Sequence, residues 1–231
     1  MNLERQLKES LQEKGNEIQP SQQLKMKVMN PAERIRTKRK KRLATGMIVT
    51  MLLVPTGAAV ASQSLLADEI YGSFENLKKH VVSATIEGFM LFNAKLSQAK
   101  GELGEVEYKE FKGHIKTISN GKLDYSNEYG SIDYDKVPAA EYEKLKQALF
   151  HAQPFFDRLN GDPSSRELLS AAEYEQYISA QLVHETILAQ NNVNVNEYYD
   201  ADEVIKIRQA EYEAAQASID RVNERQQQAR Q

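Results

Sequence analysis

Residues 43–61 read LATGMIVTMLLVPTGAAVA, a run of 19 residues without a charged side chain. At 1.5 Å rise per residue, a helix of this length reaches about 28 Å, close to the ~30 Å hydrocarbon core of a bilayer. The rest of the 231-residue chain has the mixture of charged and apolar residues of an ordinary soluble protein. The run therefore predicts one transmembrane helix, at residues 43–63, that divides the chain in two.

The charge differs on the two sides of this run. Residues 1–42 carry 12 basic and 5 acidic residues, whereas residues 43–231 carry 18 basic and 28 acidic residues. Basic residues beside a span stay in the cytoplasm, so the N-terminus is predicted to be cytoplasmic and residues 64–231 extracytoplasmic. We expect a basic collar to bind anionic lipid headgroups, at about 1 kcal/mol per basic residue. The collar consists of Arg34, Arg36, Lys38, Arg39, Lys40, Lys41 and Arg42.

Two other interpretations of the uncharged run stay open. Ala59-Val60-Ala61 has the small-x-small pattern of a signal-peptide cleavage site, although a 42-residue leader exceeds the usual total length of ~15–30 residues. Thr45, Gly46 and Pro55 dilute the apolar character of the run, as in a buried core helix. The uncleaved anchor is the prediction adopted here.

The cytoplasmic head, residues 1–42, is predicted to form short helices. Leu3, Leu7 and Leu11 recur every four residues, and Leu24 and Val28 are one turn apart after Pro20. Helices this short are marginal alone in water, so we expect this apolar stripe to dock in a groove of a partner. The alternative is a disordered tail that only sets topology. Direct nucleic-acid binding is not expected, because the charges crowd against the span and no aromatic residue accompanies them.

The outer body, residues 64–231, is predicted to be an all-α bundle of several helices. Its first helix has an apolar face made of Leu66, Ile70, Phe74, Leu77, Val81 and Ala84. A second helix, with Val106, Phe111, Ile115 and Ile118 on one face, is expected to end at Asn120-Gly121, and residues 122–137 are expected to form a loop. Asn-Gly is also a hairpin signal, so a small β-hairpin near residues 115–135 is the alternative.

Three further helices are predicted after this loop. The first should begin at Pro138 and bury one face, made of Tyr142, Leu145, Leu149 and Phe150. Gln153-Pro154 weakens this helix, and residues 160–163 should end it. Ser170 and Glu173 form a capping box for the next, which buries Tyr174, Ile178, Leu182 and Ile187. The last helix should begin at Asp200, with Glu203 completing a second box, and should carry Ile205, Tyr212, Ala215, Ile219 and Val222 at near-heptad spacing.

The tetrapeptide Ala-Glu-Tyr-Glu occurs three times, at residues 140–143, 172–175 and 210–213. One interpretation is a helical repeat array. We prefer the simpler one, because acidic residues suit the first turn of a helix and tyrosine suits a half-buried position.

The sequence contains no recognisable catalytic or metal-binding constellation. Without cysteine, the chain cannot form a disulfide, a thiol nucleophile or a cysteine zinc site. His184-Glu185 begins like a zinc-protease helix, but Leu188 stands where the second histidine is needed. Four acids near one loop could bind calcium, yet their spacing matches no EF-hand; they are Asp124, Glu128, Asp133 and Asp135. The histidines are spread singly, at His80, His114, His151 and His184. We therefore expect no enzyme, no metal and no cofactor.

The order of these segments resembles a known family. LKESLQEKGNEIQPSQQLKMKVMN in the head, the basic collar, and the outer stretches IDYDKVPAAEYEKLKQ, QPFFDRLNG and SAAEYEQY are similar to the negative effectors of extracytoplasmic-function (ECF) sigma factors in Gram-positive bacteria. These effectors are membrane-bound anti-sigma factors. The resemblance covers nearly the whole chain and is one of segments and order rather than of a catalytic signature.

The resemblance implies a regulatory protein of the cell membrane. The head would bind and silence an ECF sigma factor, and the outer domain would sense an extracytoplasmic protein or a wall ligand. Many anti-sigma factors hold zinc with one histidine and two cysteines, so this cysteine-free chain would belong to the zinc-free kind. The expected contact residues for the sigma factor are Leu3, Leu7, Leu11, Leu24 and Val28. The second hypothesis is an exported or surface-anchored helical ligand-binding domain without a sigma-factor role.

Overall fold

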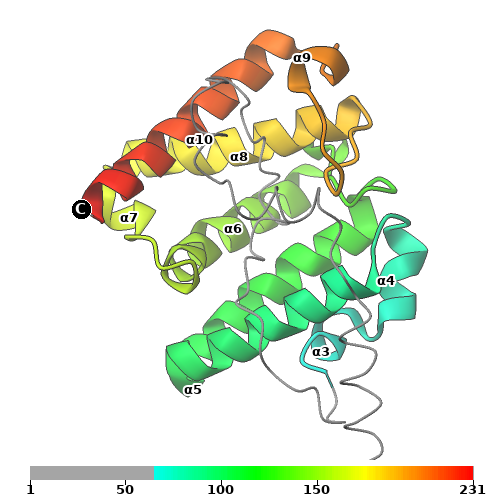
Figure 1. Cartoon of the computed structure of the whole chain (residues 1–231), viewed down its shortest axis with the longest axis vertical. Helices are drawn as coiled ribbons and strands as arrows, with labels where there is room; N and C mark the ends of the chain where they lie inside the picture. The colour runs from blue at the N-terminus through cyan, green and yellow to red at the C-terminus, as the bar shows by residue number, and fades with distance from the viewer. Residues whose placement is uncertain (1–64, 231) are drawn as a thin grey trace, which may run out of the picture. The chain divides into compact units, whose positions relative to one another are not determined.

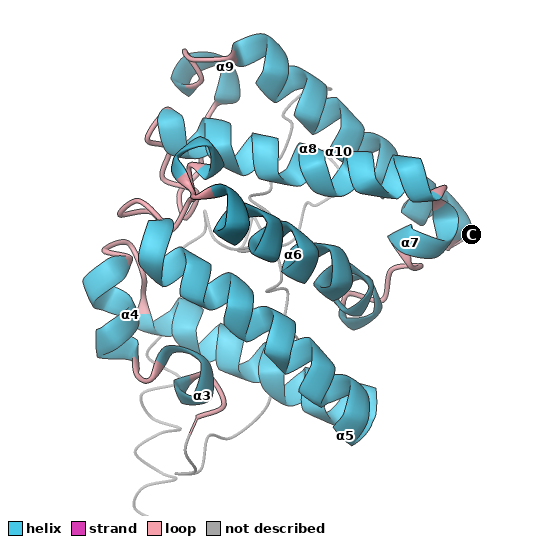
Figure 2. Ribbon diagram, turned by 180° about the vertical axis from the view of Figure 1, so that it is seen from behind, coloured by secondary structure: helices cyan, strands magenta, loops and turns pink. Residues whose placement is uncertain are grey.

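The computed structural model describes residues 65–230, which form helices joined by short connections (Figures 1 and 2). In chain order the elements are α3 (Asp68–Tyr71), α4 (Phe74–His80), α5 (Ile86–Tyr125), the 3₁₀ helix η2 (Tyr134–Lys136), α6 (Ala139–Leu159), α7 (Ser165–Leu168), α8 (Ala171–Gln190), α9 (Ala201–Val204) and α10 (Gln209–Ala229). Within the described range the only β-type pairing is an isolated bridge between Ser126 and Ile132. The all-α prediction is therefore confirmed for this part of the chain.

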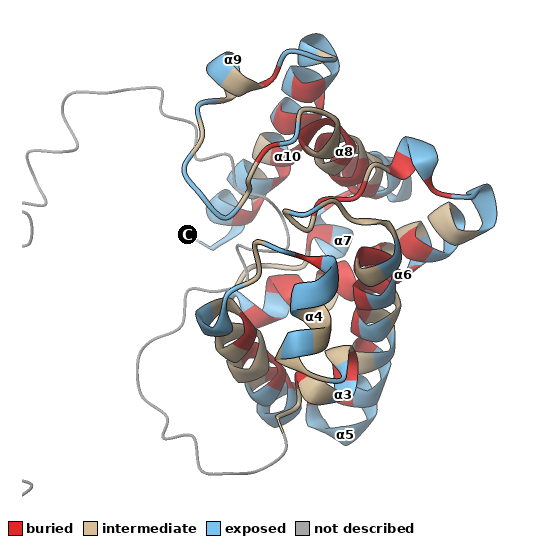
Figure 3. Cartoon of the chain, turned by 90° about the vertical axis from the view of Figure 1, so that its right-hand side faces the viewer, coloured by how far each residue is buried: buried red, intermediate tan, exposed pale blue. Residues whose placement is uncertain are grey.

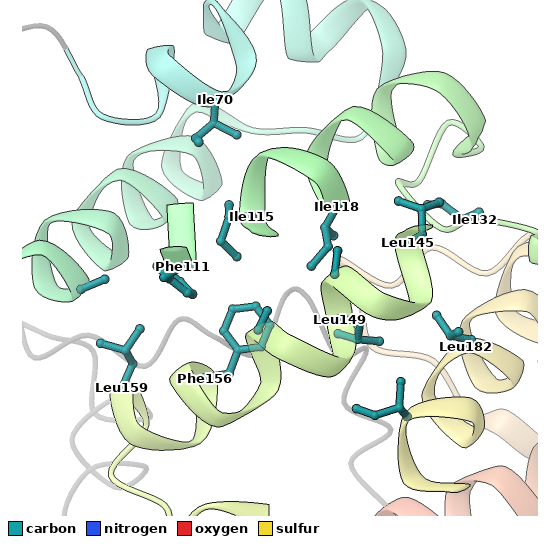
Figure 4. Packing of buried hydrophobic residues seen from close by; sticks show 14 of the residues in the cluster. Ile70, Phe111, Ile115, Ile118, Ile132, Leu145, Leu149, Phe156, Leu159 and Leu182 are labelled. Atoms are coloured by element: carbon teal, nitrogen blue, oxygen red, sulfur yellow. The ribbon is translucent and has the colours of Figure 1, made fainter. Parts of the chain in front are cut away.

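The four long helices pack one against the next in chain order. α5 packs on α6, α6 on α8 and α8 on α10, while α3 and α4 lie against α5 (Figures 1 and 2). The main core lies between these helices and is formed by side chains such as Phe111, Ile115, Leu149, Phe156 and Leu182 (Figure 4). A second, smaller core closes one end of the α8–α10 pair, with Ile187, Leu188, Val193, Ile205 and Tyr212.

The prediction of one continuous first helix is wrong, because two short helices, α3 and α4, take its place. Gly72 adopts a left-handed φ of 79° after α3, and the Ser73 side chain caps α4 by accepting the backbone N–H of Asn76 at 3.1 Å. Glycine adopts positive φ at no steric cost, so the chain turns there. Ile70 and Val81 are nevertheless buried, as the periodicity predicted.

The predicted helix end at Asn120-Gly121 is also wrong, and so is the alternative hairpin. α5 continues through both residues to Tyr125. Gly121 faces α6 so closely that a Cβ atom there would lie 2.4 Å from a methyl carbon of Leu145. The glycine is thus required by helix packing rather than by a turn. The kink in α5 lies at Gly104, with φ 74°, and the nearby Val106 is exposed rather than inward.

The next two helices agree better with their local signals. Pro138 immediately precedes α6, which continues past Pro154 and ends at Leu159, next to the predicted break. The capping box is confirmed: Ser170 Oγ accepts from the Glu173 N–H, and the Glu173 carboxylate accepts from the Ser170 N–H at 2.9 Å. The three Ala-Glu-Tyr-Glu segments open α6, α8 and α10, with Glu141, Glu173 and Glu211 in the first turns.

The last predicted helix begins where expected but is not continuous, and Asp200 caps it by accepting the Asp202 N–H at 3.1 Å rather than through a capping box with Glu203. α9 ends at Val204, and α10 begins only at Gln209 after a break. Ile205, Tyr212, Ala215, Ile219 and Val222 are all buried as expected. Within residues 65–230, no helix combines the length and the hydrophobicity that crossing a bilayer requires. The span predicted at residues 43–63 lies outside the described residues.

Candidate functional site

Three connections meet at one end of the helical domain, and we call them the loop end. They are residues 81–85 between α4 and α5, 126–133 between α5 and η2, and 191–200 between α8 and α9. The backbone N–H of Ser83 donates to the carbonyl of Glu128 at 2.9 Å, and Asn196 Nδ2 donates to Ser83 Oγ at 2.9 Å. Segments more than 100 residues apart in sequence are therefore joined by hydrogen bonds at the end of the helical domain that faces the viewer in Figure 3.

A largely buried ion pair positions the middle connection. Lys122 Nζ on α5 lies 2.7 Å from Glu185 Oε1 on α8, with side chains 11% and 18% exposed. The same ammonium donates to the carbonyl of Gly130, and Glu185 Oε1 also accepts the backbone N–H of Ile132 at 3.1 Å. Such charge-assisted hydrogen bonds are stronger than neutral ones. The pair, which we call the clamp, thus holds residues 130–132 between two long helices.

Tyr134 extends the clamp into η2. Its hydroxyl donates to Glu185 Oε2 at 3.2 Å, and its backbone N–H donates to Thr186 Oγ1 at 3.3 Å. Burial, together with the negative charge of Glu185, raises the pKa of Tyr134 well above its ordinary value. The tyrosine therefore stays a neutral donor at physiological pH, and both carboxylate oxygens of Glu185 have partners.

Exposed apolar side chains concentrate at this end. The described residues contain six large hydrophobic side chains that are exposed, and four of them lie on the loop end or immediately beside it. These four are Val82, Ile86, Tyr198 and Ile207, the last on the α9–α10 connection. Loops held on a rigid scaffold commonly carry binding residues, and exposed apolar patches often mark contact sites. The loop end is therefore the candidate contact surface for a ligand or a protein.

The histidines are less scattered than the sequence indicated. His114 on α5 and His151 on α6 stack with ring centroids 5.4 Å apart and an interplanar angle of 20°. Burial and the neighbouring His151 lower the pKa of His114, in spite of Glu110 at 3.8 Å. His184 is almost fully buried against Tyr212, with ring centroids 4.8 Å apart, and burial lowers its pKa. His80 lies in the last turn of α4.

Two of the four acidic residues considered for calcium are used by the protein itself. Asp133 and Asp135 each accept a hydrogen bond from Gln190 Nε2, at 3.0 and 3.1 Å, and Asp135 also pairs with Arg208 at 2.8 Å. Asp124 belongs to α5 rather than to the loop. Among residues 65–230, no group of three or more histidine and acidic residues is arranged to hold a metal ion.

The residues predicted to contact a sigma factor or lipid all lie outside the described part. This applies to the apolar stripe, Leu3, Leu7, Leu11, Leu24 and Val28, and to the basic collar, residues 34–42. Sequence reasoning missed the clamp, because Lys122 and Glu185 are 63 residues apart and neither belongs to a motif. The pairing of these two largely buried charges is visible only in the fold.

The fold and the loop end define an all-helical domain with a candidate contact surface formed by loops. A family model for a domain of unknown function, DUF3600, matches residues 64–225. The chain belongs to the DUF3600 family, and the match covers nearly all of the described residues. No curated protein matched this chain.

Proposed function

We propose that this protein is a membrane-anchored anti-sigma factor. The head, residues 1–42, binds and silences an ECF sigma factor, with Leu3, Leu7, Leu11, Leu24 and Val28 as the buried contacts. The collar binds anionic lipid, residues 43–63 span the membrane, and the helical domain receives an extracytoplasmic signal. The order of basic head, uncharged run and acidic helical body supports this proposal, as does the resemblance of the quoted segments to ECF sigma factor negative effectors.

The observation that carries the proposal is the way in which the helical domain begins. Ala67 is fully buried, and its backbone N–H donates to Asn93 Oδ1 on α5 at 3.2 Å. Leu65 and Leu66 pack partly buried against the main core. A span that ends at residue 63 would therefore be followed almost at once by residues that belong to the folded core. If the span ends at residue 63, only residue 64 separates it from the folded domain, so a displacement of the domain would reach the span, as a signal-transmitting anchor requires.

The loop end is the proposed receiving surface. The clamp fixes residues 130–132 to α5 and α8, and Val82, Ile86 and Tyr198 offer apolar contact area to a protein or a wall ligand. In this proposal, occupation of the loop end changes the domain, the change reaches the span through residues 65–67, and the head releases the sigma factor.

The second candidate is an exported helical ligand-binding domain without a regulatory head. It is favoured by one specific observation, the small-x-small pattern at Ala59-Val60-Ala61. The two proposals differ in the fate of the first 61 residues. An intact mass of the full chain in the membrane fraction, with the helical domain removed by external protease, agrees with the anchor. A soluble outer species that begins at Ser62 would refute it.

The sigma-factor role is tested by recovery of the partner from membranes. The full chain, tagged at its C-terminus, is solubilised and purified, and bound proteins are identified by mass spectrometry. We expect an ECF sigma factor in stoichiometric amount with the wild type, and its loss in the double variant Leu7→Asp, Leu11→Asp. The matched control, Gln12→Asp with Asn16→Asp, adds the same charge off the leucine stripe and should keep the sigma factor. Equal recovery with both double variants would contradict the docking hypothesis.

A further inference from the structure

The break between α9 and α10 has no cause in the local sequence. Residues 201–229 contain neither glycine nor proline, and the capping signal at Asp200 with the near-heptad spacing from Ile205 predicts one continuous helix. In the structure, α9 ends at Val204, and Arg208 takes a left-handed conformation with φ 59° and ψ 36°. A left-handed non-glycine residue of this kind persists only where surrounding contacts hold it.

The Asn191 side chain, at the end of α8, supplies the first set of these contacts. Its Oδ1 accepts the backbone N–H groups of Lys206 at 2.7 Å and Ile207 at 2.8 Å. Its Nδ2 donates to the carbonyls of Ile187 at 2.8 Å and Ile207 at 3.1 Å. In a continuous helix those N–H groups would instead donate to carbonyls four residues earlier. One asparagine therefore replaces two helical hydrogen bonds of the connection, those of Lys206 and Ile207.

The second set of contacts comes from Arg208 and Ile205. The Arg208 guanidinium donates to both carboxylate oxygens of Glu211, at 3.0 and 2.6 Å, and to Asp135 in η2 at 2.8 Å. Ile205 is 1% exposed and completes the small core. The break is thus fastened to α8, to η2 and to the small core at once.

We propose that the α9–α10 connection is a two-position latch. The structure shows the closed position; in the open position residues 201–229 form one straight helix. Opening exchanges the Asn191, Arg208–Asp135 and Ile205 contacts for regular backbone hydrogen bonds and releases the left-handed residue. Because the closing contacts share a few residues, loss of one set weakens the others, so the segment has two positions rather than a continuous range. The latch is independent of the proposed function and holds whichever partner the head binds.

The packing of α8 against α10 shows what the open position would do. The two helices run antiparallel, since His184 stacks on Tyr212 while Glu173 pairs with Arg225 at 3.0 Å. Extending α10 backwards in this register brings residue 205 level with residue 191, where α8 ends. Residues 201–204 would then project beyond the bundle, and Ile187, Leu188 and Val193 would lose the cover of Ile205. Opening therefore converts a folded-back segment into a projecting helix next to the loop end.

The test uses paired spin labels, which the cysteine-free chain makes straightforward. Labels are placed in the full chain at Glu203→Cys and Ala217→Cys, both exposed positions. In a straight helix these Cα atoms are 14 residues apart, about 21 Å. We expect a single closed distance in the wild type, and a second narrow population near the straight-helix distance in Asn191→Ala and in Arg208→Ala. The matched controls Asn223→Ala and Arg221→Ala change exposed residues of α10 and should keep the closed distance alone.

A proline separates straightening from local unfolding. Ala210→Pro lies in the first turn of α10, where proline is tolerated, but it would lie inside the straight helix, where proline is strongly unfavourable. Added to Asn191→Ala, it should remove the new population and restore the closed distance. The proposal is overturned if Asn191→Ala and Arg208→Ala keep only the wild-type distance. It is equally overturned if the two variants give a broad distribution of distances between the labels that Ala210→Pro does not narrow.

Discussion

Removing the positive charge of the clamp should destabilise the helical domain far more than removing an exposed lysine. In Lys122→Met the side chain keeps its length, but the ammonium that pairs with Glu185 and binds the Gly130 carbonyl is lost. Glu185 would then retain only the Ile132 N–H and the Tyr134 hydroxyl as donors. A carboxylate with a side chain 18% exposed would carry its charge without a counter-ion.

The magnitude follows from this geometry. Breaking a buried ion pair from one side costs about 3–5 kcal/mol, and the two remaining donors with partial exposure lower this to about 2–3 kcal/mol. For a domain of roughly 150–250 residues, each kcal/mol shifts Tm by about 2–4 °C. We therefore expect Tm to fall by roughly 5–10 °C. The double variant Lys122→Met, Glu185→Gln should recover part of the loss, because the unpaired charge is gone.

The assay is thermal unfolding of the full chain in detergent, followed by circular dichroism at the helical band, because the chain has no tryptophan. The matched control is Lys144→Met, which breaks the exposed pair Lys144–Glu141, with side chains 61% and 42% exposed. Pairs of this kind contribute about 0–1 kcal/mol, so Tm should change by no more than ~2 °C. Equal Tm values for Lys122→Met and Lys144→Met would refute the reasoning, as would a double variant less stable than Lys122→Met alone.

Three further predictions concern single side chains, each measured by equilibrium unfolding of the full chain. Gly121→Ala should lower the free energy of unfolding by about 1–3 kcal/mol, because the added Cβ forces Leu145 out of its place in the core. Gly113→Ala on the same helix, with no atom within 4 Å of the added Cβ, should raise it by about 0.5–1 kcal/mol. A stability change of the same sign in both variants would contradict the packing argument. Asp157→Ala should lower the free energy of unfolding by about 2–4 kcal/mol. The buried carboxylate accepts the Ser165 N–H at 2.7 Å, the Ser165 hydroxyl at 2.6 Å and Gln153 Nε2 at 2.8 Å. A loss below about 1 kcal/mol would show that these donors find other partners. Burial lowers the pKa of His184 below its ordinary value of 6.5, so below about pH 6.5 the unfolded chain binds a proton at this residue that the folded chain does not bind. The free energy of unfolding should therefore decrease with falling pH more steeply in the wild type than in His184→Gln. Parallel pH profiles of the two proteins would contradict this expectation.

Elements of the fold with a purely local cause could be predicted from the sequence. The capping box at Ser170 and the inward face of α8, with Tyr174, Ile178 and Leu182, depend on residues three or four positions apart. The break after α6 at Asn160 likewise follows from its own Asn-Gly and Asp-Pro neighbours. In each case the interacting groups are neighbours in sequence, so a periodic or motif-based pattern contains the answer.

Other elements have a local signal whose meaning is set by a distant contact. Asn120-Gly121 is typical of a turn, yet the glycine lies inside α5 because Leu145 on α6 occupies the space of a Cβ atom. The candidate site is harder still, because Lys122, Glu185 and the Ile132 N–H come together from three segments. No spacing along the chain encodes that meeting, and a lysine and a glutamate on predicted helices are ordinarily exposed.

The break at residues 205–208 shows how a tertiary contact can reverse a sound local prediction. Every residue from Ala201 to Ala229 is compatible with a helix, so local preference favours a continuous one. The break has to outweigh that preference and the left-handed Arg208, which costs on the order of 1–2 kcal/mol. Burial of Ile205 contributes about 1.5–3 kcal/mol and the Asn191 hydrogen bonds about 0.5–1.5 kcal/mol each. Each of these contributions is of similar size, so a change at one residue of the connection is enough to shift the balance between the broken and the continuous helix. The position of residues 201–208 should therefore respond to a partner that contacts the loop end beside them.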